Sequence, residues 1–200
     1  MVNNKITYSL REKILKFLLE DKGEHTILEI AKNLKADYKN VHQAVGGLYP
    51  DLIYREKKGN LNLIEIKLAP GYELCSIEEK RTREFLVDKR MKLIKEDIET
   101  ISYPFLIALI FGSFAKNTFN DKSDIDLCII SDNKDKLNEV SSKLRLLPFK
   151  IEVHEFSTKE FESMLNKKEN NLAKEIVKNN VLLFGIEDYY NLISKWMKKE

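Results

Sequence analysis

The sequence predicts an α+β protein of two domains joined by a charged helical segment. Three observations predict this class. Residues 1–67 give the order helix, helix, helix and hairpin, Pro70-Gly71 interrupts the pattern, and strands and helices alternate from residue 103 onward. We therefore expect an N-terminal domain over residues 1–67, a linker and bracing helix over 68–102, and a C-terminal domain over 103–200.

The helices of the N-terminal domain are predicted from apolar spacing and from residues that favour helix starts. Residues 6–20 carry apolar side chains at helical intervals. Thr26 and Glu29 have the spacing of a capping box, in which each side chain bonds the other residue's backbone amide. Asp37 is placed to cap a third helix over residues 38–48.

A β-hairpin follows these helices. Residues 52–56 and 61–67 alternate apolar and polar side chains, and Gly59-Asn60 between them favours a tight turn. This order of elements is that of winged helix-turn-helix domains, and residues 1–67 resemble that family.

The resemblance implies a nucleic-acid-binding face on the third helix and the hairpin. Val41 and Val45 fit the core side of this helix, which leaves a set of polar side chains outward. The candidate DNA-binding residues are Tyr38, Lys39, Asn40, His42, Gln43, Arg55, Lys57 and Lys58. Residues 1–67 hold 12 Lys and Arg against 9 Asp and Glu, which is only mildly basic. Double-stranded DNA and a docked protein therefore both stay open as partners.

The rest of the chain predicts one charged helix followed by a small α/β unit. The charged helix spans residues 76–101, where apolar side chains recur among alternating charges. Strands are expected over residues 105–111, 125–131 and 150–156, with a further apolar stretch at 181–184. Helices are expected near residues 113–118, 134–146, 158–167, 171–180 and 187–199.

The segment that ends at Gly112-Ser113 has the features of a phosphate site. A buried strand reaches Gly112, where the missing Cβ lets a phosphate approach the backbone. Ser113 opens a helix whose free amides attract anions, and its hydroxyl is a further donor. Lys116 is placed either to contact a phosphate or to face solvent.

Asp124 and Asp126 are candidate ligands of a divalent cation. Side chains two positions apart on a strand point to the same face, so we expect both carboxylates to project together, away from the core. Two adjacent carboxylates repel each other unless a cation lies between them. Oxygen ligands of this kind suit Mg²⁺ or Mn²⁺.

Asp124-Ile-Asp126 begins eleven residues after Ser113. Gly112-Ser113 followed at this spacing by the two aspartates resembles the signature of the polymerase-β-like nucleotidyltransferases. The resemblance is nearest to the minimal nucleotidyltransferases of archaea and bacteria, and it covers roughly residues 104–157. It implies a small domain with a mixed sheet. It also implies an enzyme that moves NMP from an NTP to a hydroxyl of a protein, an RNA or a small molecule. ATP is the NTP that we expect as substrate.

The same family implies a third carboxylate on the next strand, where Glu152 stands in place of the usual Asp. Asn117 likewise stands where the family usually has Gly. With Asp124 and Asp126, Glu152 is thus a candidate catalytic residue and metal ligand, and we expect it to share a second metal near the acceptor hydroxyl. An ordinary solvated glutamate is the alternative. His154, on the same strand face, is either a hydrogen-bonded histidine or part of the site.

Two functions stay open for the whole chain. The aspartates and the serine favour an active nucleotidyltransferase. Glu152 and the N-terminal domain favour a DNA-binding regulator whose second domain senses nucleotide or docks a partner. Some minimal nucleotidyltransferases nucleotidylate a HEPN-domain toxin, so the resemblance adds such a toxin as a candidate partner.

Composition limits the remaining classes. Cys75 and Cys128 fit neither a CxxC pattern nor a disulfide framework, and the three histidines lack metal-ligand spacing, so no zinc site is expected. No apolar run reaches the length of a bilayer span, so we expect a cytoplasmic protein without membrane contact. An apolar stripe from Tyr189 to Met197 indicates either core packing or a homodimer interface.

Overall fold

The computed structural model describes residues 6–101, 105–120 and 123–197, apart from the side chain of Met197. Contacts divide the chain into two compact units, and the division falls between Leu68 and Ala69. Tyr103, where the sequence places the start of the C-terminal domain, lies outside the described residues. No helix in the described ranges has both the length and the apolar character that crossing a membrane requires.

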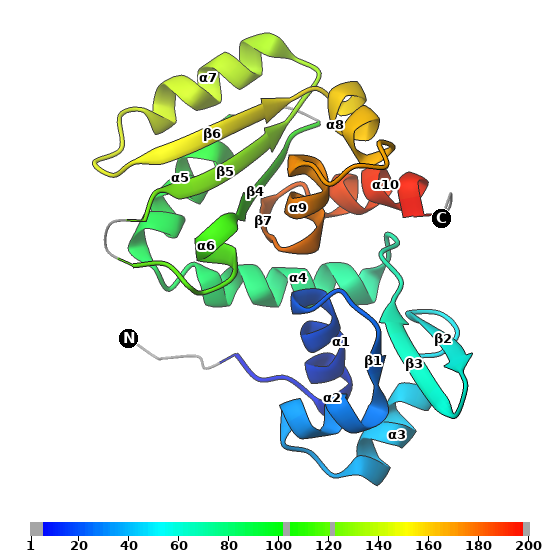
Figure 1. Ribbon diagram of the computed structural model, residues 1–200. Helices are drawn as coiled ribbons and strands as arrows, with labels where there is room; N and C mark the ends of the chain where they lie inside the picture. The colour runs from blue at the N-terminus through cyan, green and yellow to red at the C-terminus, as the bar shows by residue number, and fades with distance from the viewer. Residues whose placement is uncertain (1–5, 102–104, 121–122, 198–200) are drawn as a thin grey trace. The chain divides into compact units, whose positions relative to one another are not determined.

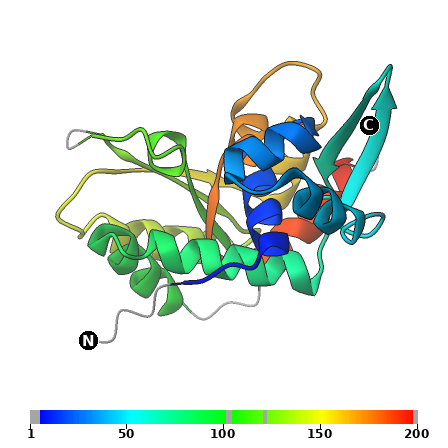
Figure 2. The same ribbon diagram turned by 90° about the horizontal axis from the view of Figure 1, so that it is seen from below.

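Unit 1 consists of three helices and a small antiparallel sheet. Its elements are α1 (Leu10–Glu20), β1 (His25–Thr26), α2 (Ile27–Leu34), α3 (Tyr38–Gly46), β2 (Ile53–Lys58) and β3 (Leu61–Ile66). The strand order is β1-β3-β2, and Figures 1 and 2 show the β2–β3 hairpin extending to one side of the helices. Gly59 and Asn60 form the two-residue turn of this hairpin, as the sequence predicts.

Local side chains decide where the helices of unit 1 begin. Thr26 and Glu29 form the expected capping box of α2, and Asp37 caps α3 through its side chain. Helix α1 begins at Leu10 rather than at residue 6, because Ser9 takes the N-cap position and bonds the third amide of the helix. Strand β1 was not expected: two residues are too short for a sequence signal, and it exists through its pairing with β3.

Unit 2 is a mixed four-stranded sheet with helices on both faces. Its elements are α4 (Tyr72–Phe85), α5 (Lys89–Glu99), β4 (Ile107–Phe111), α6 (Gly112–Ala115), β5 (Ile125–Ile130), α7 (Lys134–Leu144), β6 (Ile151–Phe156), α8 (Thr158–Leu165), α9 (Leu172–Lys178), β7 (Val181–Phe184) and α10 (Ile186–Met197). The strand order is β6-β5-β4-β7 (Figure 1). Among the strands in the described residues, only β5 and β6 pair in parallel, so the expected mixed sheet is confirmed.

The expectation of one helix over residues 76–101 is wrong. Helix α4 ends at Phe85, and α5 begins at Lys89. Asp88 accounts for the new start: its Oδ1 accepts the backbone amide of Arg90 at 2.8 Å, and its Oδ2 lies 2.6 Å from the Arg90 guanidinium. A strong N-cap inside a charged segment therefore divides it into two helices.

The two faces of the sheet are covered by different helices. Side chains of β4 and β5, such as Ile110 and Leu127, form an apolar cluster with α5 and α7. On the opposite face, Phe156 of β6 packs its ring against Phe161 of α8. The stripe of α10 also lies in the core, because Tyr189, Leu192 and Ile193 are 0–3% exposed.

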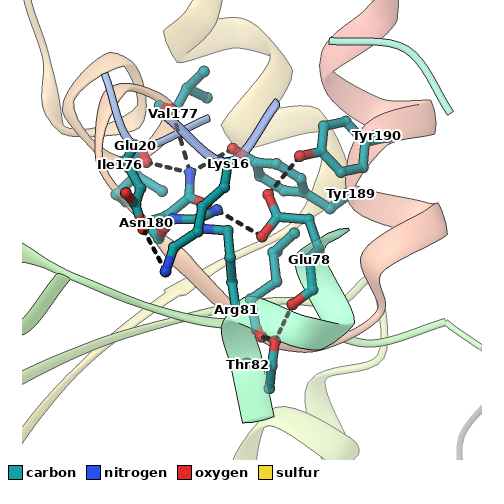
Figure 3. Close-up of polar contacts among 11 residues, drawn as sticks. Lys16, Glu20, Glu78, Arg81, Thr82, Ile176, Val177, Asn180, Tyr189 and Tyr190 are labelled. Carbon is teal, nitrogen blue, oxygen red and sulfur yellow. Dashed lines mark hydrogen bonds and ion pairs between the residues drawn. The ribbon is translucent and has the colours of Figure 1, made fainter. Parts of the chain in front are cut away.

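A buried polar network ties α4 to β7 and α10 (Figure 3). Glu78 accepts from Arg81 at 2.6 Å and from the Tyr190 hydroxyl at 2.6 Å. Arg81 also donates to the carbonyl of Asn180 at 3.0 Å, and the Asn180 amide donates to the Tyr189 oxygen at 2.8 Å. Burial and the Glu78 carboxylate raise the pKa of Tyr190 well above its ordinary value, so its hydroxyl stays a donor.

We predict that Tyr190→Phe costs about 1.5–3 kcal/mol of unfolding free energy, because it removes a donor from a buried carboxylate. Tyr189→Phe is the matched control. It should cost no more than about 1.5 kcal/mol, because the amide of Asn180 keeps the carbonyls of Ile176 and Val177 as acceptors. Denaturant unfolding followed by the fluorescence of Trp196, the single tryptophan, reports on unit 2. Equal losses in the two variants would contradict this account of the network.

Candidate functional site

The candidate site lies where β4 ends and β5 begins. In the antiparallel pairing of these strands, Phe111 stands opposite Asp126. In the parallel pairing of β5 with β6, Asp126 stands opposite Glu152, and Cys128 stands opposite His154. Three adjacent strands therefore present Gly112, Asp126 and Glu152 at one end of the sheet.

Gly112 is required by the carboxylate of Asp126. The backbone of Gly112 has φ +68°, and a Cβ at this position would lie 2.0 Å from Asp126 Oδ2. A side chain would therefore be strained and would also collide with the carboxylate. The sequence predicts an approaching phosphate in this space, whereas in the structure the Asp126 side chain occupies it.

Asp126, Glu152 and His154 form a cluster in which one ligand atom from each residue lies within 4.8 Å of the others. Asp126 and His154 are half-buried, and Glu152 is exposed. Partial burial raises the pKa of Asp126 above its ordinary value, and the charge of Glu152 raises it further. The cluster thus concentrates negative charge that a cation would stabilise.

Asp124 lies just before β5, and its carboxylate binds the ammonium group of Lys150. Hydrogen bonding to Asp124 raises the pKa of Lys150. Lys150 is not among the site residues that the sequence predicts. It precedes β6 as Asp124 precedes β5, and because Ile125 pairs with Ile151, parallel pairing makes these two positions neighbours. The structure therefore groups Asp126 with Glu152 and joins Asp124 to Lys150.

The loop after Gly112 is short and tightly turned. Helix α6 has only four residues, and the amide of Thr118 bonds back to the carbonyl of Ser113 at 2.9 Å. Asn117 has φ +54°, a conformation that asparagine tolerates better than most residues. Asn117 can therefore stand where the resemblance implies Gly without breaking this loop.

A hollow of about 590 Å³ adjoins Lys116 and runs along α9. Three lysines line it, Lys116, Lys174 and Lys178, together with Glu175. Lys116 Nζ lies 3.4 Å from Glu175 Oε1, and the charge of Glu175 also raises the pKa of Asp126. The hollow therefore lies within electrostatic reach of the acidic cluster.

Comparison with known proteins agrees with this geometry. Residues 94–189 match the sequence model of the family described as "Polymerase beta, Nucleotidyltransferase". The match supports a nucleotidyltransferase domain over these residues. A curated relative from Methanocaldococcus jannaschii, named "Putative protein adenylyltransferase", is 28% identical over 97 residues, which span 46% of this chain and 70% of the relative.

The donors of the acidic cluster in unit 2 fit a divalent cation. Carboxylate oxygens are the preferred ligands of Mg²⁺ and Mn²⁺, and Asp126 and Glu152 offer them from adjacent strands. Burial raises the pKa of Asp126 and the charge of Glu152 raises it further, and a bound cation would oppose both effects. Asp124 can join them if Lys150, whose side chain is 78% exposed, moves away.

Glu155, the other glutamate of β6, belongs to the opposite face of this strand from Glu152. Its carboxylate accepts a hydrogen bond from the hydroxyl of Ser141 on α7. Neighbouring residues on a strand point in opposite directions, so Glu155 faces away from the cluster that Glu152 and His154 share.

The candidate DNA-binding residues of unit 1 lie on its surface. Every side chain proposed on α3 is exposed, and so are those proposed on β2. Lys58 differs from its neighbours, because its Nζ lies 2.6 Å from Glu24 Oε1. This pair leaves less of its positive charge available to a partner than Arg55 and Lys57 offer.

We predict that Asp126→Asn stabilises unit 2 near neutral pH when no metal is present. Because the folded pKa of Asp126 lies above its ordinary value of 3.8, the ionised side chain is less favourable in the folded than in the unfolded chain. This penalty is present above the raised pKa and absent below 3.8, where both states are protonated. The gain in melting temperature, measured with EDTA, should therefore fade as pH falls.

Asp124→Asn is the control for this experiment. It loses the pair with Lys150 and should give no gain at any pH. An Asp126→Asn variant that is no more stable than wild type near neutral pH would contradict the raised pKa of Asp126, and so would a gain that is independent of pH.

Proposed function

We propose that unit 2 is a metal-dependent nucleotidyltransferase that moves AMP from ATP to a hydroxyl acceptor. The observation that carries this proposal is the pairing of Asp126 with Glu152 beside the Gly112-Ser113 turn. This turn and the acidic pair supply the two requirements of the reaction, a place for the triphosphate and ligands for divalent metal.

Asp124, Asp126 and Glu152 would hold the metal, as the resemblance implies. When bound there, a divalent metal would compensate the charge of the triphosphate and lower the pKa of the acceptor hydroxyl. The acceptor oxygen bonds to the α-phosphorus, the bond between the α-phosphate and the pyrophosphate breaks, and the hydroxyl proton leaves to water or to a carboxylate. Lys150 must release Asp124 for that carboxylate to take part.

The lysine-lined hollow is the proposed place for the nucleotide. It begins at Lys116, four residues after Gly112, and Lys174 and Lys178 lie one helical turn apart on α9. Ammonium groups on one wall suit the phosphates of a nucleotide, while Asn171 and Asn179 offer hydrogen bonds.

A protein hydroxyl is the acceptor that we favour, because the relative from Methanocaldococcus jannaschii is named for protein adenylylation. The test is incubation with each α-labelled NTP, Mg²⁺ or Mn²⁺, and a cell lysate. Label that a protease removes and a ribonuclease does not supports a protein acceptor. NTP binding without label transfer under any condition would favour the regulator, whose second domain only senses nucleotide.

We predict that Glu152→Gln lowers transfer at least about 100-fold while NTP affinity changes only about threefold, because the third carboxylate acts on the acceptor rather than on NTP binding. Glu152→Asp restores the usual residue of the family and should keep or raise the rate. Glu155→Gln is the matched control, since Glu155 faces α7 and should leave transfer unchanged. Wild-type transfer by Glu152→Gln would show that Glu152 is not the third carboxylate.

We propose in addition that unit 1 is a winged helix-turn-helix that binds double-stranded DNA. The exposed polar side chains of α3, together with Arg55 and Lys57 on the hairpin, support this proposal. A hairpin beside such a helix is the arrangement in which a helix can enter the major groove while the hairpin contacts the phosphates.

We predict that Lys57→Ala flattens the slope of log affinity against log salt by about one unit for duplex DNA, because one phosphate contact is lost. Lys58→Ala, the control, should change the slope less, because Glu24 already pairs with that ammonium. Fluorescence anisotropy across a salt series measures both slopes. Absence of duplex binding at low salt would favour docking of a protein partner instead.

A further inference from the structure

His154 lies beside the acidic pair because of the strand geometry. Glu152 and His154 are two positions apart on β6, so their side chains share the face on which Asp126 lies. The imidazole contributes a ligand atom to the cluster in which all three atoms lie within 4.8 Å of one another. The three carboxylates that the resemblance implies at this site do not include a histidine.

The His154 ring is held in place more firmly than the Glu152 carboxylate. Its side chain is 25% exposed against 59% for Glu152. Its ring meets the Phe111 ring edge-on, with centroids 5.3 Å apart and an interplanar angle of 63°. Phe111 is the last residue of β4 and the strand partner of Asp126, so the packing positions the imidazole over the same strand ends.

Hydrogen bonding to Glu152 does not account for this position. His154 Nε2 lies 3.4 Å from Glu152 Oε1, longer than the roughly 2.7–3.2 Å of a good N–H···O bond. A nitrogen and two carboxylate oxygens at this spacing can instead converge on one ion. Neutral imidazole nitrogen is a common metal ligand.

We propose that His154 Nε2 is a metal ligand with Asp126 and Glu152, and that it makes this site prefer Mn²⁺ over Mg²⁺. Mg²⁺ prefers oxygen ligands and gives up its waters reluctantly, whereas Mn²⁺, a transition-metal ion, accepts an imidazole nitrogen more readily. The inference rests on the proposed function, because it concerns the metal that the same two carboxylates would hold.

The test is electron paramagnetic resonance of Mn²⁺ bound to the full chain without an affinity tag, with and without α,β-methylene-ATP. Wild type should show the electron spin echo modulation of a directly bound imidazole ¹⁴N. Labelling histidine alone with ¹⁵N should replace that signal without any mutation. The protein has only three histidines, so His42→Gln, on the surface of α3, is the matched control and should retain the signal.

His154→Gln should lose the nitrogen signal. It should weaken Mn²⁺ binding about tenfold or more and Mg²⁺ binding less than about threefold. Trp196 fluorescence checks that the variant is folded. The inference is overturned if Mn²⁺ binds wild type without a histidine nitrogen signal, or if the signal persists in His154→Gln. Either result leaves the proposed function standing.

Failure of the proposed function gives a different result. If Asp126→Asn binds Mn²⁺ as wild type does, the acidic pair is not the metal site. If wild type binds no Mn²⁺ under either condition, both the inference and the metal requirement are wrong.

Discussion

The parallel pairing of β5 with β6 is the contact on which the candidate site depends. It places Asp126 opposite Glu152, although like charges opposite each other on neighbouring strands destabilise a sheet. Buried apolar side chains such as Leu127 and Ile129 hold the pairing against that repulsion. The fold therefore leaves the repulsion between the two carboxylates in place, and a bound cation would relieve it.

Gly112 and Asp126 form a second constraint that the pairing of β4 with β5 imposes. The turn after β4 can close over Asp126 only if residue 112 has no Cβ. Strand β4 also pairs with β7, and the buried network of Glu78, Arg81 and Tyr190 joins the region around β7 to α4 and α10. Packing far from the carboxylates thus helps to fix the strand that ends at the site.

Local signals account for most of the elements that the sequence predicts correctly. The capping box of Thr26 and Glu29, the N-cap at Asp37 and the turn at Gly59 each involve residues close together in the chain. The same kind of signal explains the one large error. Asp88 is an N-cap within a continuous apolar and charged pattern, and the periodicity of residues 76–101 concealed it.

The sequence by itself determined the nucleotidyltransferase motif, because Gly112, Ser113, Asp124 and Asp126 belong to one short stretch with a recognisable spacing. The sequence also predicted Glu152 as the third carboxylate, because Glu152 lies on the strand that follows the two aspartates. Only the tertiary structure decided that His154 joins Asp126 and Glu152, that Lys150 binds Asp124, and that Glu155 faces α7. The reason is register: a shift of one residue in the β5–β6 pairing would reverse the face of every side chain on β6, and distant packing sets that register.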